Sequence, residues 1–220
     1  MAKLTDIQIF QNKQTFISLL SSVKRKGVDD IISWLEEKTD FFEAPSSGYY
    51  HGAYKGGLCQ HSLNVYNALK KMVDATKELA LPEKQLDDIS EDTLILVALL
   101  HDLCKVNFYK KEIKAFKDEY TNTWKHYYAY GFDDTFPVGH GEKSVIIAQK
   151  FIDLTVSEIL AIRWHMGFSD PGLSSSSYEG PAFNKAINIC PLVILLQNAD
   201  IYASFMMEPM FDAKKENLID

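Results

Sequence analysis

One stretch of the chain decides its fold, residues 94–105, which read LILVALLHDLCK. Residues 94–100 are apolar on almost every side of a helix, a pattern that is typical of a helix at the centre of a hydrophobic core. His101 and Asp102 fall in the last turn of that helix, where an isolated ionised carboxylate would lose its hydration at a high energetic cost. We therefore expect positive charge next to Asp102.

A second apolar run ends in an acid in the same way. Residues 192–196, LVILL, lead to Asp200, and Pro191 stands at a favourable first-turn position of the predicted helix. Two buried carboxylates repel each other unless a cation lies between them. Imidazole nitrogen and carboxylate oxygen are the ligands that Mg²⁺ and first-row divalent ions accept. A single histidine on a helix is usually an ordinary core or surface residue, so the indication comes from a set that falls in or beside predicted helices: His61, His101, His140 and His165.

Length and composition limit the classes of protein to which this chain can belong. With 220 residues and 46% hydrophobic content, the chain is long enough for one well-buried core, so we predict a single domain over 1–220. The net charge is −7 and the basic residues are dispersed, which argues against strong binding to duplex nucleic acid. Three widely separated cysteines without a C-x-x-C pair argue against both a disulfide framework and a cysteine zinc site. No apolar run approaches the roughly 20 residues of a membrane span, and we expect a cytoplasmic protein.

Hydrophobic periodicity predicts a mostly helical chain. The expected helices cover residues 5–24, 29–37, 58–81, 90–100, 141–151, 157–164 and 191–207. Ser90 is the expected cap of the apolar helix, with two acids in its first turn. The polar stretch 110–119 is compatible with further helix, whereas residues 123–132 are rich in aromatic side chains and compatible with a hairpin. The fold class is thus predicted as all-α, with at most one short β-hairpin near residues 120–137.

The pattern H…HD…D, here His61, His101-Asp102 and Asp200, resembles the ligand signature of the HD-domain metal-dependent phosphohydrolase superfamily. The resemblance implies an HD-type helical bundle, with a core over 49–207 and a helical extension over 1–48. A closer likeness, over roughly residues 50–205, is to the HD half of a bacterial 3′-to-5′ exoribonuclease family. It lies in residues 53–61 (AYKGGLCQH), 99–105 (LLHDLCK), 139–140 (GH) and 164–167 (WHMG).

The resemblance also implies that His140 and His165 are metal ligands, since extra histidines of this kind accompany two or more metals in those relatives. Many of them have two consecutive histidines where this chain has His165-Met166, so we expect two divalent ions rather than three, drawn from Mn, Fe, Ni, Co, Zn or Mg. A second difference concerns the nuclease reading. The exoribonuclease carries an OB-type domain before its HD half, and the first 50 residues here are too few and too helical to form one.

Two catalytic residues follow from this reading. Asp102 is the natural bridging ligand of two ions, which would activate a water for attack on phosphorus. Lys105 lies one helical turn beyond it on the same face, where its ammonium can pair with a phosphate oxygen; the alternative is a solvated lysine at a helix end. Tyr54 and Lys55 belong to one of two aromatic segments, 49–55 and 124–130, that could line a base-binding pocket. An ordinary lid or core cover is the alternative for both segments.

Several functions remain open at this stage. The first is a metal-dependent phosphohydrolase that cleaves a phosphomonoester or phosphodiester of a nucleotide or short oligonucleotide, with a small phosphorylated molecule as its partner. The second is a 3′-to-5′ exoribonuclease. The third is a non-catalytic module that binds metal or a signalling nucleotide, although a complete ligand set favours an enzyme. A mixed-valent di-iron oxygenase is a further possibility in HD-type folds, and the sequence leaves the oligomeric state open.

Overall fold

The computed structural model describes residues 3–79, 86, 89–170, 173 and 179–219. Its α-helices are α1 (Asp6–Ser22), α2 (Val28–Lys38), α3 (Gly57–Leu79), α4 (Glu91–Leu100), α5 (His140–Ala148), α6 (Val156–Trp164), α8 (Glu179–Ile189), α9 (Pro191–Tyr202) and α10 (Ala213–Glu216). Three short turns complete the helical part: the 3₁₀ turns η2 (Leu103–Lys105) and η3 (Gly167–Ser169), and the π-helical turn η4 (Ala203–Met207). The predicted all-α class is confirmed.

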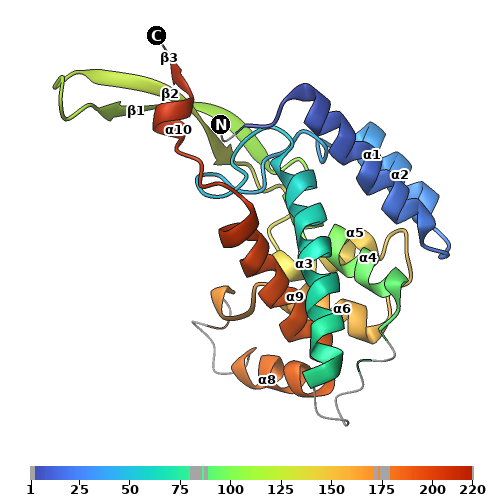
Figure 1. The fold of residues 1–220 in the computed structure, drawn as a ribbon. Coiled ribbons are helices and arrows are strands. Elements are labelled where there is room, and N and C mark those ends of the chain that lie inside the picture. The colour runs from blue at the N-terminus through green and yellow to red at the C-terminus, as the bar shows by residue number, and fades with distance from the viewer. Residues whose placement is uncertain (1–2, 80–85, 87–88, 171–172, 174–178, 220) are drawn as a thin grey trace.

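Helix α4 lies inside the helical body, as its sequence predicts. Every residue from Leu94 to Leu100 is buried, and α3, α6 and α1 all pack against this helix. Helices α3 and α9 run side by side across one face of the body, while α1 and α2 form a pair on its flank (Figure 1). One large buried cluster takes residues from both α1 and α9, so the N-terminal helices share the main core. The division into an extension over 1–48 and a core over 49–207 stays a prediction.

Local sequence signals set several helix starts. Ser90 caps α4 by accepting a hydrogen bond from the backbone N–H of Thr93, as predicted. Thr5 and Thr155 each form a complete capping box at the starts of α1 and α6. Gly141 lies where α5 crosses α6, and a Cβ atom there would come within 2.1 Å of the Arg163 carbonyl oxygen. A side chain at this position would therefore push the two helices apart.

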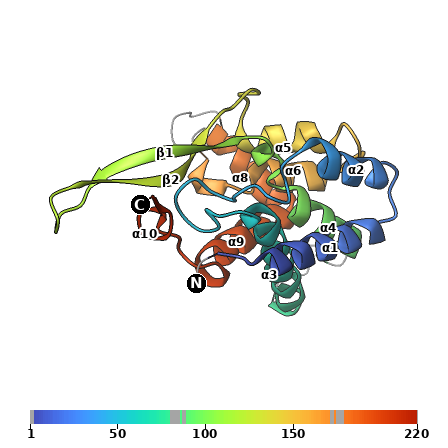
Figure 2. The ribbon, with the colours of Figure 1, turned by 90° about the horizontal axis from the view of Figure 1, so that it is seen from above.

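The sheet is larger than predicted, and the helical reading of residues 110–119 is wrong. Strands β1 (Tyr109–Lys117) and β2 (Trp124–Phe132) pair antiparallel along their full length, and the short strand β3 (Leu218–Ile219) joins the other edge of β2. The pairing is favoured by cross-strand aromatic contacts such as Phe116 with Tyr127, whose ring centroids are 5.7 Å apart. Asp118 accepts backbone hydrogen bonds from the turn between the strands. The two long strands extend beyond the helical body as an arm (Figure 2).

Two further features were not predicted from the sequence. Helix α8 precedes α9, and the predicted helix over 191–207 changes after Tyr202 into the π-helical turn η4.

None of the described helices is by itself long and apolar enough to span a membrane. Helix α8 together with α9 and η4 passes that test only as a pair bent by 103°.

Candidate metal centre

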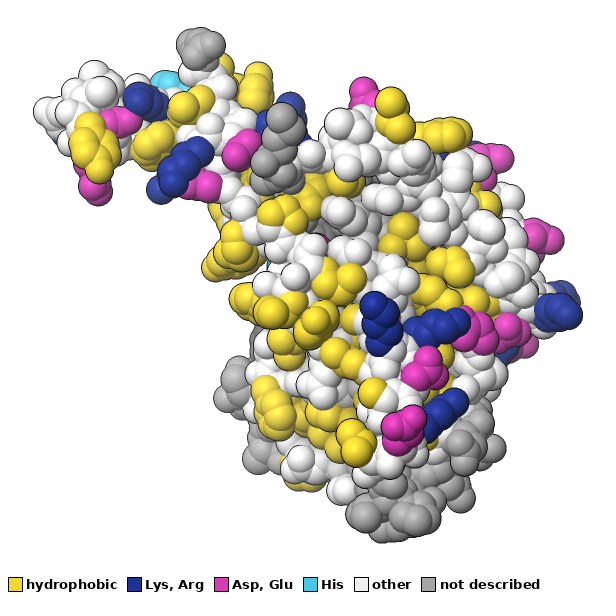
Figure 3. All heavy atoms as spheres, viewed as in Figure 1, with side chains coloured by type: hydrophobic (Ala, Val, Ile, Leu, Met, Phe, Trp, Pro, Cys, Tyr) yellow, Lys and Arg dark blue, Asp and Glu magenta, His cyan; other side chains and the backbone are white. Residues whose placement is uncertain are grey.

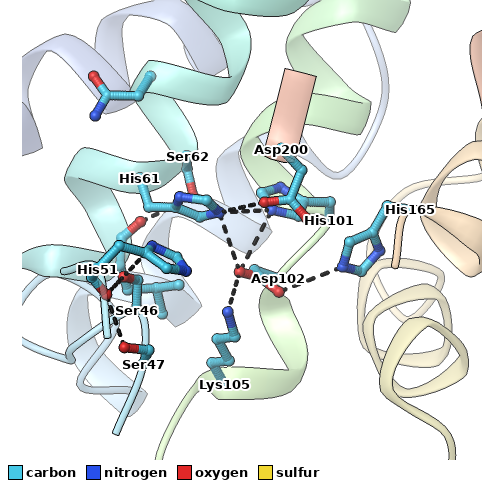
Figure 4. Close-up of polar contacts among 12 residues, drawn as sticks. Ser46, Ser47, His51, His61, Ser62, His101, Asp102, Lys105, His165 and Asp200 are labelled. Atoms are coloured by element: carbon cyan, nitrogen blue, oxygen red, sulfur yellow. Dashed lines mark hydrogen bonds and ion pairs between the residues drawn. The ribbon is translucent and has the colours of Figure 1, made fainter. Parts of the chain in front are cut away.

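Five separate elements bring the six predicted ligands together. His61 lies in α3, His101 and Asp102 follow the end of α4, and the remaining ligands stand on three other helices: His140 at the start of α5, His165 at the end of α6 and Asp200 on α9. Figure 4 shows the Asp102 carboxylate between the imidazoles of His61, His101 and His165. The expectation that these side chains converge inside the bundle therefore agrees with the structure.

The two oxygens of Asp102 face two different groups of imidazoles. Oδ2 lies 3.6 Å from Nε2 of His61 and 3.4 Å from Nε2 of His101. Oδ1 lies 2.9 Å from Nε2 of His140 and 3.6 Å from Nε2 of His165. Asp200 completes the first group, with its Oδ1 at 3.1 Å from Nε2 of His61. The arrangement is that of a carboxylate shared by two clusters of donor atoms.

Hydrogen bonds orient the ligand nitrogens toward this centre. Nδ1 of His101 lies 2.8 Å from the carbonyl oxygen of Ala98, and Nδ1 of His165 lies 2.7 Å from that of Ile162. A carbonyl oxygen only accepts, so Nδ1 carries the hydrogen in both rings and Nε2 offers a lone pair. Among the described residues, the buried Nε2 of His165 has no hydrogen-bond partner. An unpartnered buried nitrogen that faces a carboxylate fits a metal ligand.

The charges of the site favour a bound cation. Although burial raises the pKa of Asp102, the neighbouring Lys105 ammonium holds it well below its usual range. Burial lowers the pKa of both His101 and His140, which keeps these rings neutral. Ionised carboxylates and neutral imidazoles are the forms that bind metal ions. Groups of three such side chains, including His61 with His101 and Asp200, place their ligand atoms within 4.8 Å of one another.

Residues 58–204 match the HD domain family. The chain belongs to the HD-domain family. Over 75 residues it is also 37% identical to a dihydroneopterin 2′,3′-cyclic phosphate phosphodiesterase of Methanocaldococcus jannaschii, a match that covers 34% of this chain and 28% of the relative. The match thus spans less than a third of that relative's length. No solved structure matches the chain significantly. The predicted HD-domain membership is confirmed, whereas the closer likeness to exoribonucleases stays a prediction.

Two further residues near this centre were not predicted from the sequence as part of it, and both lie outside the matched residues 58–204. Glu208 is buried, and its Oε1 lies 2.9 Å from Nδ1 of His61, while its Oε2 lies 2.7 Å from Nδ1 of His51. Burial opposes protonation of His61, but the carboxylates of Glu208 and Asp200 outweigh it and raise the pKa of His61 to about 10, so an ion bound at its Nε2 would displace a proton from this ring. Burial likewise opposes the charge of Glu208, yet His61 and His51 hold its pKa at about 2. No motif marks Glu208, because its contacts come from residues more than 140 positions away.

A cavity of about 540 Å³ is lined by three of the six predicted ligands, His140, His165 and Asp200. Lys105 also lines it, with Nζ 2.6 Å from Oδ2 of Asp102. Of the described residues that line the cavity, Lys105 is the only lysine or arginine. The other walls are largely aromatic or apolar: Tyr50, Tyr109, Met166, Ile201, Phe205 and Met210. Apolar side chains also gather on the face of the body shown in Figure 3. The side chains of Phe205 and Met206 in η4 are well exposed.

Tyr54 and Lys55, the predicted substrate-binding residues, are not brought to this cavity. Tyr54 is buried in a small second cluster, where its ring centroid lies 5.8 Å from that of Phe211 and its hydroxyl donates to Gln60. Lys55 is exposed and pairs with Glu43 at 3.1 Å. Both line a separate cavity of about 210 Å³. The same sequence segment does reach the larger cavity, which contains His140 and His165, but through Tyr50 and His51.

Proposed function

We propose that this HD domain is a metal-dependent phosphohydrolase that acts on a small, nucleotide-like phosphate ester. The observation that carries the proposal is the position of Asp102, whose two oxygens face separate groups of imidazoles, with His140 and His165 of one group lining an open cavity. The side chains that would hold two divalent ions are His61, His101, Asp102, His140, His165 and Asp200. The unpartnered Nε2 of His165 and the all-nitrogen and oxygen donor set support this assignment.

If bound by these residues, divalent ions would supply a lowered pKa for a coordinated water and positive charge opposite a phosphate. The chain itself supplies orientation and further charge. Lys105 contacts Asp102 and also lines the cavity, so its ammonium is placed to contact a phosphate oxygen that approaches the ligands. A cation held at this point before the substrate arrives stabilises negative charge as it develops on that oxygen.

The walls of the cavity favour a particular substrate class. One lysine among the described lining residues matches a substrate with a single phosphate group better than a triphosphate or a long nucleic acid. The rings of Tyr50, Tyr109 and Phe205 offer surfaces for a flat heterocycle. The matched relative bears the name of an enzyme for dihydroneopterin 2′,3′-cyclic phosphate. Nucleoside and pterin 2′,3′-cyclic phosphates are therefore the first substrates to test.

The test begins with metal analysis of protein purified without a chelator. Hydrolysis is then measured with Mn²⁺, Co²⁺, Ni²⁺, Zn²⁺, Fe²⁺ or Mg²⁺ on 2′,3′-cyclic phosphates, nucleoside monophosphates, cyclic dinucleotides and labelled single-stranded RNA. We expect metal-dependent cleavage of a small ester, lost in Asp102→Asn and kept in Asp74→Asn, a matched change at an exposed site on α3.

Other outcomes would replace the proposal. Stepwise shortening of RNA without cleavage of small esters would identify an exoribonuclease. Bound metal without hydrolysis of any ester would identify a binding module, and a coloured iron centre that consumes oxygen would identify an oxygenase.

A further inference from the structure

The metal-facing histidines differ in what their second ring nitrogen contacts. Nδ1 of His101 and of His165 donates to a backbone carbonyl, a neutral acceptor. Nδ1 of His61 instead lies 2.9 Å from a carboxylate oxygen of Glu208, and the side chains of both residues are 1% exposed. A carboxylate behind a ligand histidine fixes its tautomer and ring orientation and makes its other nitrogen a stronger donor.

Glu208 is itself held in place from two sides. Its Oε2 lies 2.7 Å from Nδ1 of His51, and its Oε1 accepts a hydrogen bond of 3.1 Å from the side-chain amide of Asn64. It follows directly after the π-helical turn η4, on the same segment that carries Asp200. The imidazole of His61 therefore lies between two acids of the C-terminal segment 200–208 and contacts Asp200 through Nε2 and Glu208 through Nδ1.

The other half of the centre lacks such support. His140 has its Nε2 at 2.9 Å from Asp102, and its ring nitrogens lie 3.3 and 3.4 Å from the thiol of Cys104, a weak partner. The side chain of His140 is 29% exposed, against 1% for His61. His140 and His165 line the open cavity, as does Asp200 of the first group. His140 is thus less firmly oriented and closer to solvent than His61, whereas the side chain of His165 is 0% exposed.

We propose that Glu208 is a positioning residue that makes the two ion positions unequal. The ion held by His61, His101, Asp102 and Asp200 is bound tightly, and the ion held by Asp102, His140 and His165 is bound more weakly and exchanges with the medium. This inference rests on the metal centre of the proposed function and adds an order of affinity to it.

The test is a titration of metal-free protein with Mn²⁺, followed by calorimetry and by metal analysis after gel filtration. We expect wild-type protein to retain one ion through gel filtration and to bind a second at least about 10-fold more weakly. Glu208→Gln keeps an oxygen that can accept from Nδ1 but removes its charge. It should weaken the first ion by about 10–100-fold, the range found for such supporting groups, and leave the second within about 2-fold.

Two further variants serve as a matched control and as a milder change at the same carboxylate. Glu216→Gln removes an exposed acid of the same C-terminal segment and should change neither affinity. His51→Gln leaves the contact between His61 and Glu208 but loosens the carboxylate, so it should weaken the first ion less than Glu208→Gln does. If circular dichroism shows that Glu208→Gln does not fold, His51→Gln carries the comparison.

Each outcome decides the matter. Two equal affinities in wild-type protein, an unchanged first affinity in Glu208→Gln, or an equal loss at both positions would overturn the role of Glu208 and leave the proposed hydrolase intact. Unequal binding of two ions without any hydrolysis would support the role of Glu208 and remove the hydrolase instead. A wild-type protein that binds no divalent ion would remove both.

Discussion

Replacing Lys105 with alanine tests whether this lysine stabilises negative charge on the substrate or holds Asp102 in place for metal binding. Its Nζ lies 2.6 Å from Oδ2 of Asp102, and its side chain is 14% exposed where it lines the cavity. It is not a metal ligand, so we expect the Lys105→Ala protein to bind as much Mn²⁺ as the wild type. Loss of one fixed charge that stabilises developing negative charge lowers kcat by about 10²–10³-fold, or about 2.7–4 kcal/mol.

The same variant should behave differently without metal. Asp102 is 2% exposed, and removal of its lysine leaves a buried carboxylate without its cationic partner. Breaking a buried pair in this way costs about 3–5 kcal/mol, so the chelated variant should unfold at clearly lower denaturant concentration than the chelated wild type. Saturating Mn²⁺ should remove most of that difference, because ions then offset the charge of Asp102.

The assays are steady-state kinetics with saturating Mn²⁺, metal analysis and denaturant unfolding with and without chelator. Lys105→Met keeps the apolar stem without the charge, and it should match the alanine variant if the charge is what matters. Loss of bound metal in both variants would refute this reasoning, because Lys105 would then act by holding Asp102. An unchanged kcat would show that the charge of Lys105 does not contribute to the reaction rate.

Three other predictions follow from the structure. Chelation should lower the thermal midpoint, since each ion at 100 times its dissociation constant contributes about 2.7 kcal/mol, and scanning fluorimetry with added Mn²⁺ should show recovery; an unchanged midpoint would contradict the metal centre. Tyr54→Ala should destabilise the protein by about 3 kcal/mol or more without changing KM, whereas Tyr50→Ala should raise KM with little loss of stability. Denaturant unfolding measures the stability and steady-state kinetics measures KM. The opposite pattern in the two variants would contradict this assignment. Gly141→Ala should force α5 away from α6 and weaken the ion held by His140, which calorimetry with Mn²⁺ can measure; wild-type affinity and stability would show that the helices tolerate the methyl group.

Much of the proposed metal centre could be predicted from local sequence. Residues 94–100 and 192–196 are so apolar that both helices had to be buried, and an acid at the end of each then required a cation nearby. This reasoning depends only on residues within one or two turns of one another. The capping residue Ser90 was predictable for the same reason, because a cap acts on the backbone three residues away.

The tertiary structure decided which of the remaining side chains reach the centre. Glu208 lies 147 positions from His61 along the chain, so nothing in the spacing of either residue indicated their contact. Tyr54 and Tyr50 belong to one aromatic segment, yet only Tyr50 enters the larger cavity, since the hairpin and the C-terminal segment bury Tyr54 in a second cluster. Residues 109–117 became a strand, where the sequence allowed a helix over 110–119, because β2 was available to pair with them. Hydrophobic periodicity reports that a residue is buried, but the partner against which it is buried depends on how distant segments pack.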